Sequence, residues 1–322
     1  MKKQFIVLAT FFSSISQLVF GQQDAQFSQY LFNGIYINPA YAGYKEVLNL
    51  HSFYRSQWTG ITGAPKTGSI VVDAIANEGN VGLALQAVND RLGAQRNNSV
   101  YLNYAYRIRL NAEGSSRLAF GLSGGVAQYG IDGDKLSTND PELNFNASRN
   151  LIVPNASFGI YFANDKYFAG ISADNLIASQ YNDEKFRNLA KPQIHAYLTA
   201  GMLIPLSTNI NLKPSFLLKE DFGGPTNLDL NAFLLFGESI WLGGSYRTGI
   251  KIWDKSYLQK ELSNSDSFVA ALEVFPQSNI RLGYAYDFSV GPLQGYSGGS
   301  HEISLAYYFR RTRLRMATQR VF

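Results

Sequence analysis

Alternation between apolar and polar side chains, repeated along most of the chain, is the feature that most restricts the fold. Between residues 46 and 309 the sequence breaks into roughly fourteen runs of 9–15 residues with this period of two. In the clearest run, one face holds Val100, Leu102, Tyr104, Tyr106 and Ile108, and the other holds Ser99, Asn103, Ala105, Arg107 and Arg109. Strict alternation of this kind predicts β-strands whose two faces meet different surroundings.

The connectors between these runs alternate between short and long. Short ones lie at 76–79, 163–165, 205–208, 237–239 and 276–278, and long ones span roughly 131–151, 175–192, 250–266 and 289–300. Ten-residue strands with tight turns at one end and long loops at the other are typical of outer-membrane β-barrels. We therefore predict an all-β fold, an antiparallel up-and-down transmembrane β-barrel of about 14 strands over residues 46–309. A large soluble β-sandwich is the competing interpretation.

The composition agrees with a barrel. Aromatic residues make up 14% of the chain, and interfacial aromatic girdles account for such a share. The mean hydropathy of −0.11 is unremarkable because a barrel alternates lipid-facing and lumen-facing residues. Beyond the first 21 residues no apolar run is long enough for a spanning helix, so only a closed barrel could cross a membrane. The absence of cysteine excludes disulfides and thiolate metal sites.

The first 21 residues have the organisation of a secretory signal peptide. Lys2 and Lys3 supply the basic start, residues 5–12 the apolar centre, and Gly21 a small residue for cleavage. A transmembrane anchor is the alternative, but the apolar stretch is shorter than the roughly 20 residues that a spanning helix needs. We therefore expect an exported chain that reaches the bacterial outer membrane.

Two further segments lie outside the expected barrel. Residues 22–45 lack a clean period and contain Pro39 and Gly43, which favour turns, so we expect a lead-in segment in the periplasm or the lumen. Residues 310–322 form a basic tail without acids, which holds Arg310, Arg311, Arg313, Arg315 and Arg320. This tail is either a solvated extension or a site for an acidic or phosphate-bearing partner.

The tail also explains the net charge of the chain. Without its five arginines and the two leader lysines, the formal net charge of +4 becomes −3. The body of the protein has no basic stripe and no known reader motif, so we do not expect nucleic acid as a partner.

No residue pattern points to an enzyme, a metal or a cofactor. Residues 121–125 and 295–299 both match G-x-S-x-G, but neither has the strand–turn–helix context that a nucleophilic Ser123 or Ser297 requires. His301 is not followed by a second histidine four residues on, so H-E-x-x-H is missing. The acidic loop at 132–142 departs from the spacing of a calcium loop, and we interpret it as solvated.

Several short motifs occur in an order that resembles the PorP/SprF family of the type IX secretion system. They are Asp24–Tyr30, Asn38–Gly43, Arg55–Trp58, Gly63–Thr67, Asn89–Asp90, Tyr104–Arg107 and Gly299–Ile303. The resemblance spans essentially the whole expected mature chain. Ala25 is a minor departure, because the family commonly has proline there.

The resemblance implies an outer-membrane barrel, in contact with membrane lipid, that binds, helps export or anchors a secreted surface protein with a C-terminal sorting domain. A gliding adhesin is one such partner, and other members of the family resemble components of a periplasmic motor-linked complex. The family offers no catalytic residue. We expect structural or partner contacts from the motif residues Asn38, Pro39, Tyr41, Gly43, Arg55, Gln57, Trp58, Pro65, Asn89, Asp90, His301 and Glu302.

A diffusion channel or ligand transporter remains the alternative function. The expected lumen face carries polar residues such as Asn49, Arg55, Asn103 and Arg107. A barrel of fourteen strands is wide enough to conduct unless something fills it. The lead-in segment at 22–45 is the candidate to fill it.

Overall fold

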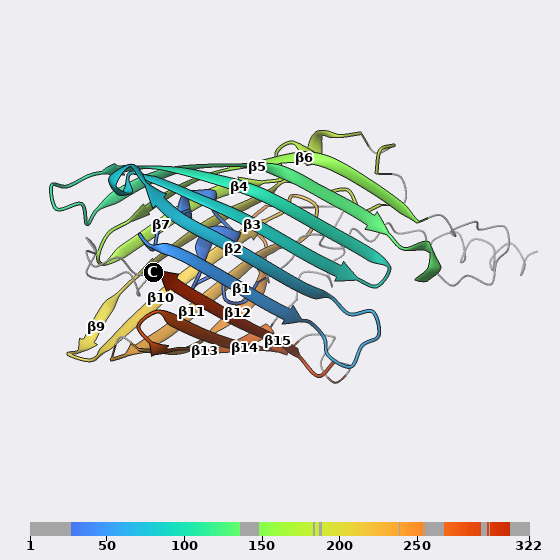
Figure 1. Ribbon diagram of the computed structural model, residues 1–322. Coiled ribbons are helices and arrows are strands. Elements are labelled where there is room, and N and C mark those ends of the chain that lie inside the picture. The colour runs from blue at the N-terminus through green and yellow to red at the C-terminus, as the bar shows by residue number, and fades with distance from the viewer. Residues whose placement is uncertain are drawn as a thin grey trace, which may run out of the picture.

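The computed structural model describes residues 27–135, 148–182, 184–186, 189–237, 239–253, 255, 267–290, 295 and 297–309. The expected signal peptide, the basic tail and most of the acidic loop lie outside this part of the chain. Figure 1 shows a single tilted barrel in which strands follow one another in chain order around the wall.

Fifteen strands make up one antiparallel sheet in the described part of the chain. They are β1 (Leu48–Ser56), β2 (Lys66–Ala76), β3 (Val81–Leu92), β4 (Gln95–Arg109), β5 (Arg117–Ile131), β6 (Arg149–Ala163), β7 (Tyr167–Asp174), β8 (His195–Met202), β9 (Ile204–Ser207), β10 (Ile210–Glu220), β11 (Thr226–Phe236), β12 (Ile240–Ile250), β13 (Ser267–Gln277), β14 (Ile280–Ser289) and β15 (Ser300–Phe309).

The sheet closes on itself. β1 pairs with β15, and β10 pairs with β11, so the order around the wall has no gap. β8 and β9 both pair with β10 and are two parts of one strand, interrupted at Leu203. The wall therefore has fourteen strand positions, which confirms the predicted antiparallel barrel. Closure pairs the strands all the way around the wall, as a barrel that crosses a membrane requires.

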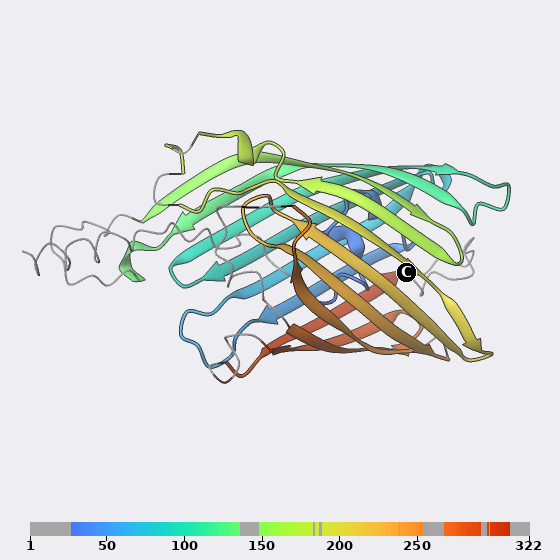
Figure 2. The same cartoon turned by 180° about the vertical axis from the view of Figure 1, so that it is seen from behind.

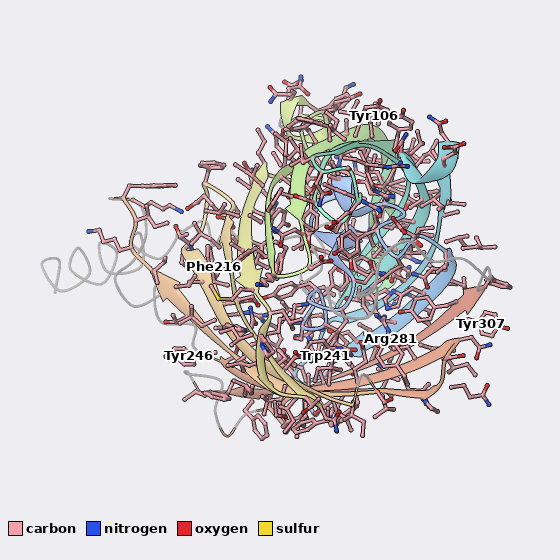
Figure 3. All side chains as sticks on the ribbon, turned by 90° about the vertical axis from the view of Figure 1, so that its left-hand side faces the viewer. Tyr106, Phe216, Trp241, Tyr246, Arg281 and Tyr307 are labelled. Atoms are coloured by element: carbon pink, nitrogen blue, oxygen red, sulfur yellow. The ribbon has the colours of Figure 1, made fainter. Side chains whose placement is uncertain are left out.

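The predicted alternation of faces is also confirmed. Leu102 on β4 and Leu122 on β5 each expose 60% of their surface on the outside. Asn103, which directly follows Leu102, points inward and exposes 2%. Figure 3 shows Tyr106, Tyr246 and Tyr307 outside the ribbon, and Trp241 and Arg281 inside it. Because apolar side chains cover the outer face while polar ones point inward, the wall has the surface of a lipid-embedded barrel.

Most short connectors lie where the sequence places them, with two corrections. The predicted turn at 205–208 is wrong, because Ile204–Ser207 forms strand β9 and the turn follows at 208–209. Pro205 fits in β9 since this strand pairs only with β10, and proline is tolerated where one edge needs no donor. The predicted turn at 276–278 is also wrong, because β13 runs to Gln277 and the turn follows at 278–279. Pro276 lies inside β13, beside a register shift between Val274 and Gln277.

Helical structure is limited to five 3₁₀ turns among the described residues. They are η1 (Gly34–Tyr36), η2 (Pro39–Tyr41), η3 (Asn77–Gly79), η4 (Gly133–Lys135) and η5 (Ala178–Gln180). No helix in the described part of the chain is long and apolar enough to cross a membrane.

The largest apolar core lies inside the barrel. Residues 30–44 supply much of it, and inward side chains such as Phe53, Phe233 and Trp241 complete it. In Figure 2 the N-terminal segment, drawn in blue, is seen within the barrel. This segment, residues 27–47, is called the plug below.

Candidate functional site

The plug runs lengthwise through the lumen. Its start contacts Asp287 and Glu302, near the long-loop ends of β14 and β15, and its end contacts Arg117 at the short-turn end of β5. From Ser28 to Val47 every residue is buried except Gly34 and Glu46, which are half-buried. Hydrogen bonds join the plug to β1, β2, β4, β5, β6, β7, β10, β11, β14 and β15.

Two asparagines shape the plug locally. Asn33 Oδ1 accepts a hydrogen bond from Ile35 N at 3.3 Å at the start of η1, and Asn38 Oδ1 accepts one from Ala40 N at 2.9 Å at the start of η2. Asparagine at such a position satisfies a main-chain donor that the turn leaves open, and Pro39 directly after the cap fits the fixed φ of a helical turn. The sequence therefore folds this segment into two tight turns that fit within the barrel.

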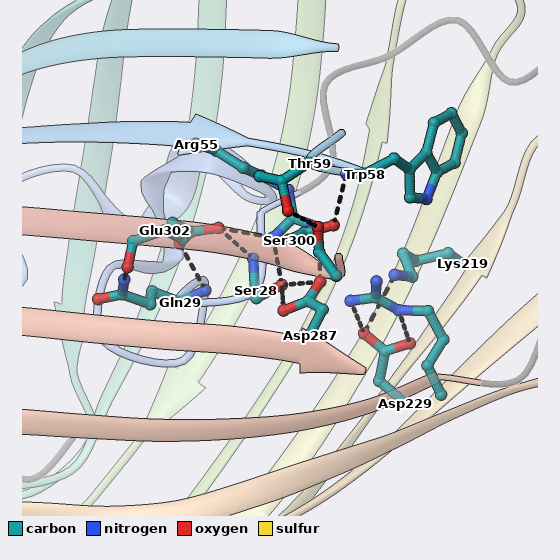
Figure 4. A network of polar contacts seen from close by, with 12 residues as sticks. Ser28, Gln29, Arg55, Trp58, Thr59, Lys219, Asp229, Asp287, Ser300 and Glu302 are labelled. Carbon is teal, nitrogen blue, oxygen red and sulfur yellow. Dashed lines mark hydrogen bonds and ion pairs between the residues drawn. The ribbon is translucent and has the colours of Figure 1, made fainter. Parts of the chain in front are cut away.

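A buried ion-pair network fastens the start of the plug to the wall (Figure 4). Arg55 on β1 donates to Asp287 at 2.5 Å, to Glu302 at 3.0 Å and to the hydroxyl of Ser28 at 2.6 Å. The carboxylate of Glu302 also accepts the main-chain N–H groups of Ser28 and Gln29, at 2.8 and 2.9 Å. These five residues are called the latch. One guanidinium and two plug amides thus share two carboxylates in a site closed to water.

Two cations of the wall, on β10 and β14, hold the next plug residues. Lys213 Nζ on β10 donates to the carbonyl oxygen of Leu31 at 3.3 Å, and Arg281 Nη1 on β14 donates to that of Phe32 at 2.8 Å. Main-chain carbonyls of an irregular segment need such partners when they are buried. The plug is therefore bonded on two sides within its first six described residues.

Glycines in the wall allow the Asn-Pro-Ala turn to approach the barrel main chain. Gly121 and Gly159 are directly paired on β5 and β6. A Cβ at Gly121 would lie 2.0 Å from Ala40 N, and a Cβ at Gly159 would lie 2.1 Å from Asn38 Oδ1. Asn38 Nδ2 in turn donates to the carbonyl oxygen of Ile160 at 3.0 Å. At these two positions only glycine leaves room for the plug to approach the wall.

At the end of the plug, a cation of the wall again binds a main-chain carbonyl oxygen. Gly43 has a φ of +64°, which favours glycine, and the Ala42 carbonyl oxygen accepts a hydrogen bond from Arg107 Nη2.

The pKa of Lys45, a plug residue outside the strands, is lowered to about 8. Burial and the nearby Arg281 disfavour its charged form more than the neighbouring carboxylates favour it.

A second buried network lies in the wall beside the latch (Figure 4). Asp229 on β11 accepts from Lys219 at 3.1 Å and from Arg247 at 2.9 and 3.1 Å. Its carboxylate is paired with one cation from β10 and one from β12, so it cross-links three neighbouring strands of the wall.

Six of the predicted motif residues meet around the plug. Asn38, Pro39, Tyr41 and Gly43 lie in the plug itself, and Arg55 and Glu302 belong to the latch. Whether these residues also contact a partner stays a prediction.

The other predicted residues lie away from the plug, toward the long-loop end or on the outer face. Gln57 N donates to the Pro65 carbonyl oxygen at 3.0 Å, which closes the loop between β1 and β2. Trp58 N donates to Ser300 Oγ at 3.2 Å. Asp90 accepts from Thr67 at 2.6 Å, and Asn89 donates to Asn98 at 2.5 Å. His301 lies 2.7 Å from the hydroxyl of Tyr284. The tail arginines fall outside the described residues.

Several residues that form the contacts between the plug and the wall are missing from the predicted set. They are Ser28, Gln29, Arg107, Lys213, Asn231, Arg281 and Asp287. Three of them, Ser28, Gln29 and Arg107, stand inside the family-like motifs and could have been selected there. For the wall residues the only available signal was a charged or amide side chain at an inward position.

Comparison with known sequences identifies a family. The profile of the family described as type IX secretion system membrane protein PorP/SprF matches residues 19–307. No curated protein matches the chain.

Among solved structures, the CymD monoaromatic hydrocarbon channel aligns with a TM-score of 0.52 and 11% identity, over 88% of this chain and 94% of that one. The Acinetobacter baumannii outer membrane protein Omp33 aligns with a TM-score of 0.47 and 6% identity, over 82% and 100%. At 11% identity, the alignment with the CymD channel shows the fold alone.

The barrel, its lipid-facing surface and the family profile together place the protein in the bacterial outer membrane. The profile covers most of the chain, including the plug and all but the end of the last strand. The chain therefore belongs to the PorP/SprF family of type IX secretion system membrane proteins.

Proposed function

We propose that this barrel binds and anchors an exported surface protein during type IX secretion, and does not serve as a pore. The observation that carries the proposal is the filled lumen. A segment that is hydrogen-bonded to ten strands blocks the route that a porin uses for solutes. The partner is an exported protein with a C-terminal sorting domain, such as a gliding adhesin.

A rigid barrel suits an anchoring role. Preorganised surfaces bind with a smaller entropic cost than mobile ones. The plug and the latch brace the wall from within, and loops at the long-loop end are joined to one another. Thr59 N donates to the Gly299 carbonyl oxygen at 2.8 Å, and Gly93 N donates to the Gly63 carbonyl oxygen at 2.8 Å. This braced end is the surface we assign to the exported partner.

The positions of the histidines support a function without catalysis. His51 lies 3.0 Å from the hydroxyl of Tyr36 in the plug, His195 contacts the Gln193 carbonyl oxygen, and His301 contacts a tyrosine on the outer face. Each has a structural partner, and we assign no hydrolytic role to Ser123 or Ser297.

Affinity capture tests the anchoring proposal. The tagged protein is isolated from outer membranes in mild detergent after brief cross-linking, and the bound proteins are identified by mass spectrometry. We expect a large exported protein with a C-terminal sorting domain. In a deletion strain the same protein should stay in the periplasm or be released into the medium. Normal surface display without the barrel contradicts the proposal.

Planar-bilayer recording tests the channel alternative. The filled lumen leads us to expect no steady conductance steps from the purified protein. Steady open steps from the wild type would favour a channel over an anchor.

The basic tail is assigned to a periplasmic partner, such as another type IX component. A variant with the five tail arginines changed to glutamine should assemble normally but co-purify less of that partner, because its charge contacts are lost. A lysine-for-arginine tail is the matched control, since it keeps the charge. Loss of assembly in both variants would mean that the tail acts in insertion.

A further inference from the structure

Three cations lie in a row on the outer face of the wall. Lys66 on β2 is directly paired with Arg91 on β3, which is directly paired with Arg96 on β4. All three side chains are exposed. Each lies on the same face of its strand as an exposed apolar residue, namely Ile70, Leu85 and Val100. These three cations are called the cationic row. It lies at the long-loop end, at the right of Figure 1, and this end faces the cell exterior in barrels of this kind.

The residues that flank the row on the outer face carry no charge. Ser56 on β1 is directly paired with Lys66, and Gly130 on β5 is directly paired with Arg96. Like charges that stand directly opposite each other on neighbouring strands destabilise a sheet. An anion that lies across the row offsets this repulsion, so the row favours a negatively charged ligand.

A ladder of amides separates the row from the apolar outer band. Asn89 Nδ2 donates to Asn98 Oδ1 at 2.5 Å, and Asn98 Nδ2 donates to Gln128 Oε1 at 2.9 Å. Arg91 and Arg96 each stand two residues beyond this ladder, and two residues span about 7 Å along a strand. The lipid-facing band of a barrel is apolar, so the ladder marks its outer limit. The row therefore lies at the height of the outer-leaflet headgroups.

A pocket opens beside two members of the row. Its volume is about 490 Å³, within the range of about 300–1,000 Å³ that is usual for ligand sites. Lys66 and Arg91 line one part of it, and Trp58, Ile61 and Ala64 of the loop between β1 and β2 line another. Tryptophan is common where a membrane meets water. The pocket thus joins cations to apolar side chains, as a site for a lipid with an anionic headgroup requires.

The pocket is held in shape by its own main chain. Gly93 N in the turn between β3 and β4 donates to the Gly63 carbonyl oxygen at 2.8 Å, and this bond ties the two sides of the pocket together. A further cation, Lys135, also lines the pocket, but Asp132 pairs with it at 3.4 Å. Lys66 and Arg91 are therefore the cations that we assign to a ligand.

We propose that the cationic row and this pocket bind the phosphorylated headgroup of an outer-leaflet lipid. Directly paired residues have Cβ atoms about 4.5–5.5 Å apart, so neighbouring cations of the row reach the same phosphate. Arginine and lysine form short, charge-assisted hydrogen bonds to phosphate oxygens. The acyl chains of the lipid then lie along the apolar residues of β2, β3 and β4. An acidic protein segment would match the charge of the row but not the apolar band beside it. The proposal does not depend on the anchoring function.

Lipid binding is measured on the full-length protein by native mass spectrometry in a neutral detergent and a buffer without phosphate. The probes are lipid A with its phosphates and lipid A from which the phosphates have been removed. We expect saturable binding of the phosphorylated lipid and about tenfold weaker binding of the other. Inorganic phosphate at the same concentration should not displace the lipid. Equal binding of the two lipids refutes a headgroup site, and displacement by inorganic phosphate refutes a lipid site.

Variants locate the site. Arg91→Gln should weaken binding of the phosphorylated lipid about fivefold, and the triple variant with Lys66→Gln and Arg96→Gln about hundredfold, because cations near an anionic surface contribute independently. Arg91→Lys keeps the charge and should bind nearly as the wild type does. Lys166→Gln is the matched control, since Lys166 is an exposed cation in the short turn between β6 and β7, at the opposite end. Unchanged binding in the triple variant, or an equal loss in Lys166→Gln, overturns the assignment.

Unfolding in vesicles gives a second readout. In phosphatidylcholine alone, the triple variant should be at least as stable to urea as the wild type, because the repulsion within the row is gone. Adding phosphorylated lipid A should stabilise the wild type but not the triple variant, since a ligand stabilises only a fold that binds it. Poly-glutamate is the probe for an acidic protein segment. If it binds the row more tightly than lipid A does, or if lipid A stabilises both proteins equally, the lipid assignment is wrong.

Discussion

Replacing Arg55 by methionine tests the role of the latch most directly. The substitution keeps an unbranched chain of similar length but removes the guanidinium from a site where Arg55 is 1% exposed. Asp287 and Glu302 then remain buried without their cation. Removing one partner of a buried ion pair costs about 3–5 kcal/mol. As long as the plug is docked, its two amides still donate to Glu302, which keeps the loss within this range.

The expected consequence is release of the plug. A loss of about 4 kcal/mol lowers the ratio of docked to released plug by about 10³-fold, at 1.4 kcal/mol per factor of ten. Planar-bilayer conductance reports an opened lumen, and limited proteolysis reports an exposed plug. We expect Arg55→Met to show frequent open steps and rapid cleavage near residue 30, while the wild type shows neither.

Lys219→Met is the matched control. Lys219 is a buried cation, but it bonds to Asp229 in the wall, where Arg247 remains as a second partner. It should lower barrel stability without opening the lumen. A triple variant, Arg55→Met with Asp287→Asn and Glu302→Gln, should recover part of the loss because no uncompensated charge remains. The reasoning is refuted if Arg55→Met stays closed and protease-resistant, or if Lys219→Met opens as readily.

Three further perturbations follow from the same contacts. Gly121→Val should displace the plug and admit current because its Cβ would lie 2.0 Å from a plug nitrogen, whereas Gly124→Val, with nothing within 4 Å, should behave as wild type in the same recording. Leu122→Arg, in the middle of the apolar outer band, should lower the free energy of unfolding by about 2–4 kcal/mol, measured by urea unfolding from liposomes. Gln128→Arg, near the long-loop end, should lower it by only about 0–1 kcal/mol. The pKa of Lys45 is about 8 in the folded state against 10.5 for the free side chain, so between these pH values the unfolded state binds more protons. The free energy of unfolding should therefore rise with pH over this range, and Lys45→Met should lose this rise when unfolding is measured as a function of pH.

The wall of this barrel could be predicted from short stretches of sequence. The alternation at Leu102, Asn103 and Tyr104 assigns outward and inward positions, because side chains of a strand alternate whatever its neighbours are. Short and long connectors then order the strands, since consecutive antiparallel strands pair most readily across tight turns. The turn expected at Pro205 was wrong because proline punctuates most sheets, and only the one-sided pairing of β9 shows that a strand continues through it.

The filled lumen was decided only by the tertiary structure. The bonds between Ser28 and Glu302 join residues 274 positions apart, and those between Tyr30 and Asn231 join residues 201 apart. The alternation along a strand shows only whether a side chain points inward or outward. It is the same for an inward arginine such as Arg55 whether the lumen holds water or a plug. The family-like motifs mark the residues, but closure of the barrel is what brings them together. The sequence by itself determined the strands and their faces through local geometry, and the tertiary structure determined what those faces enclose.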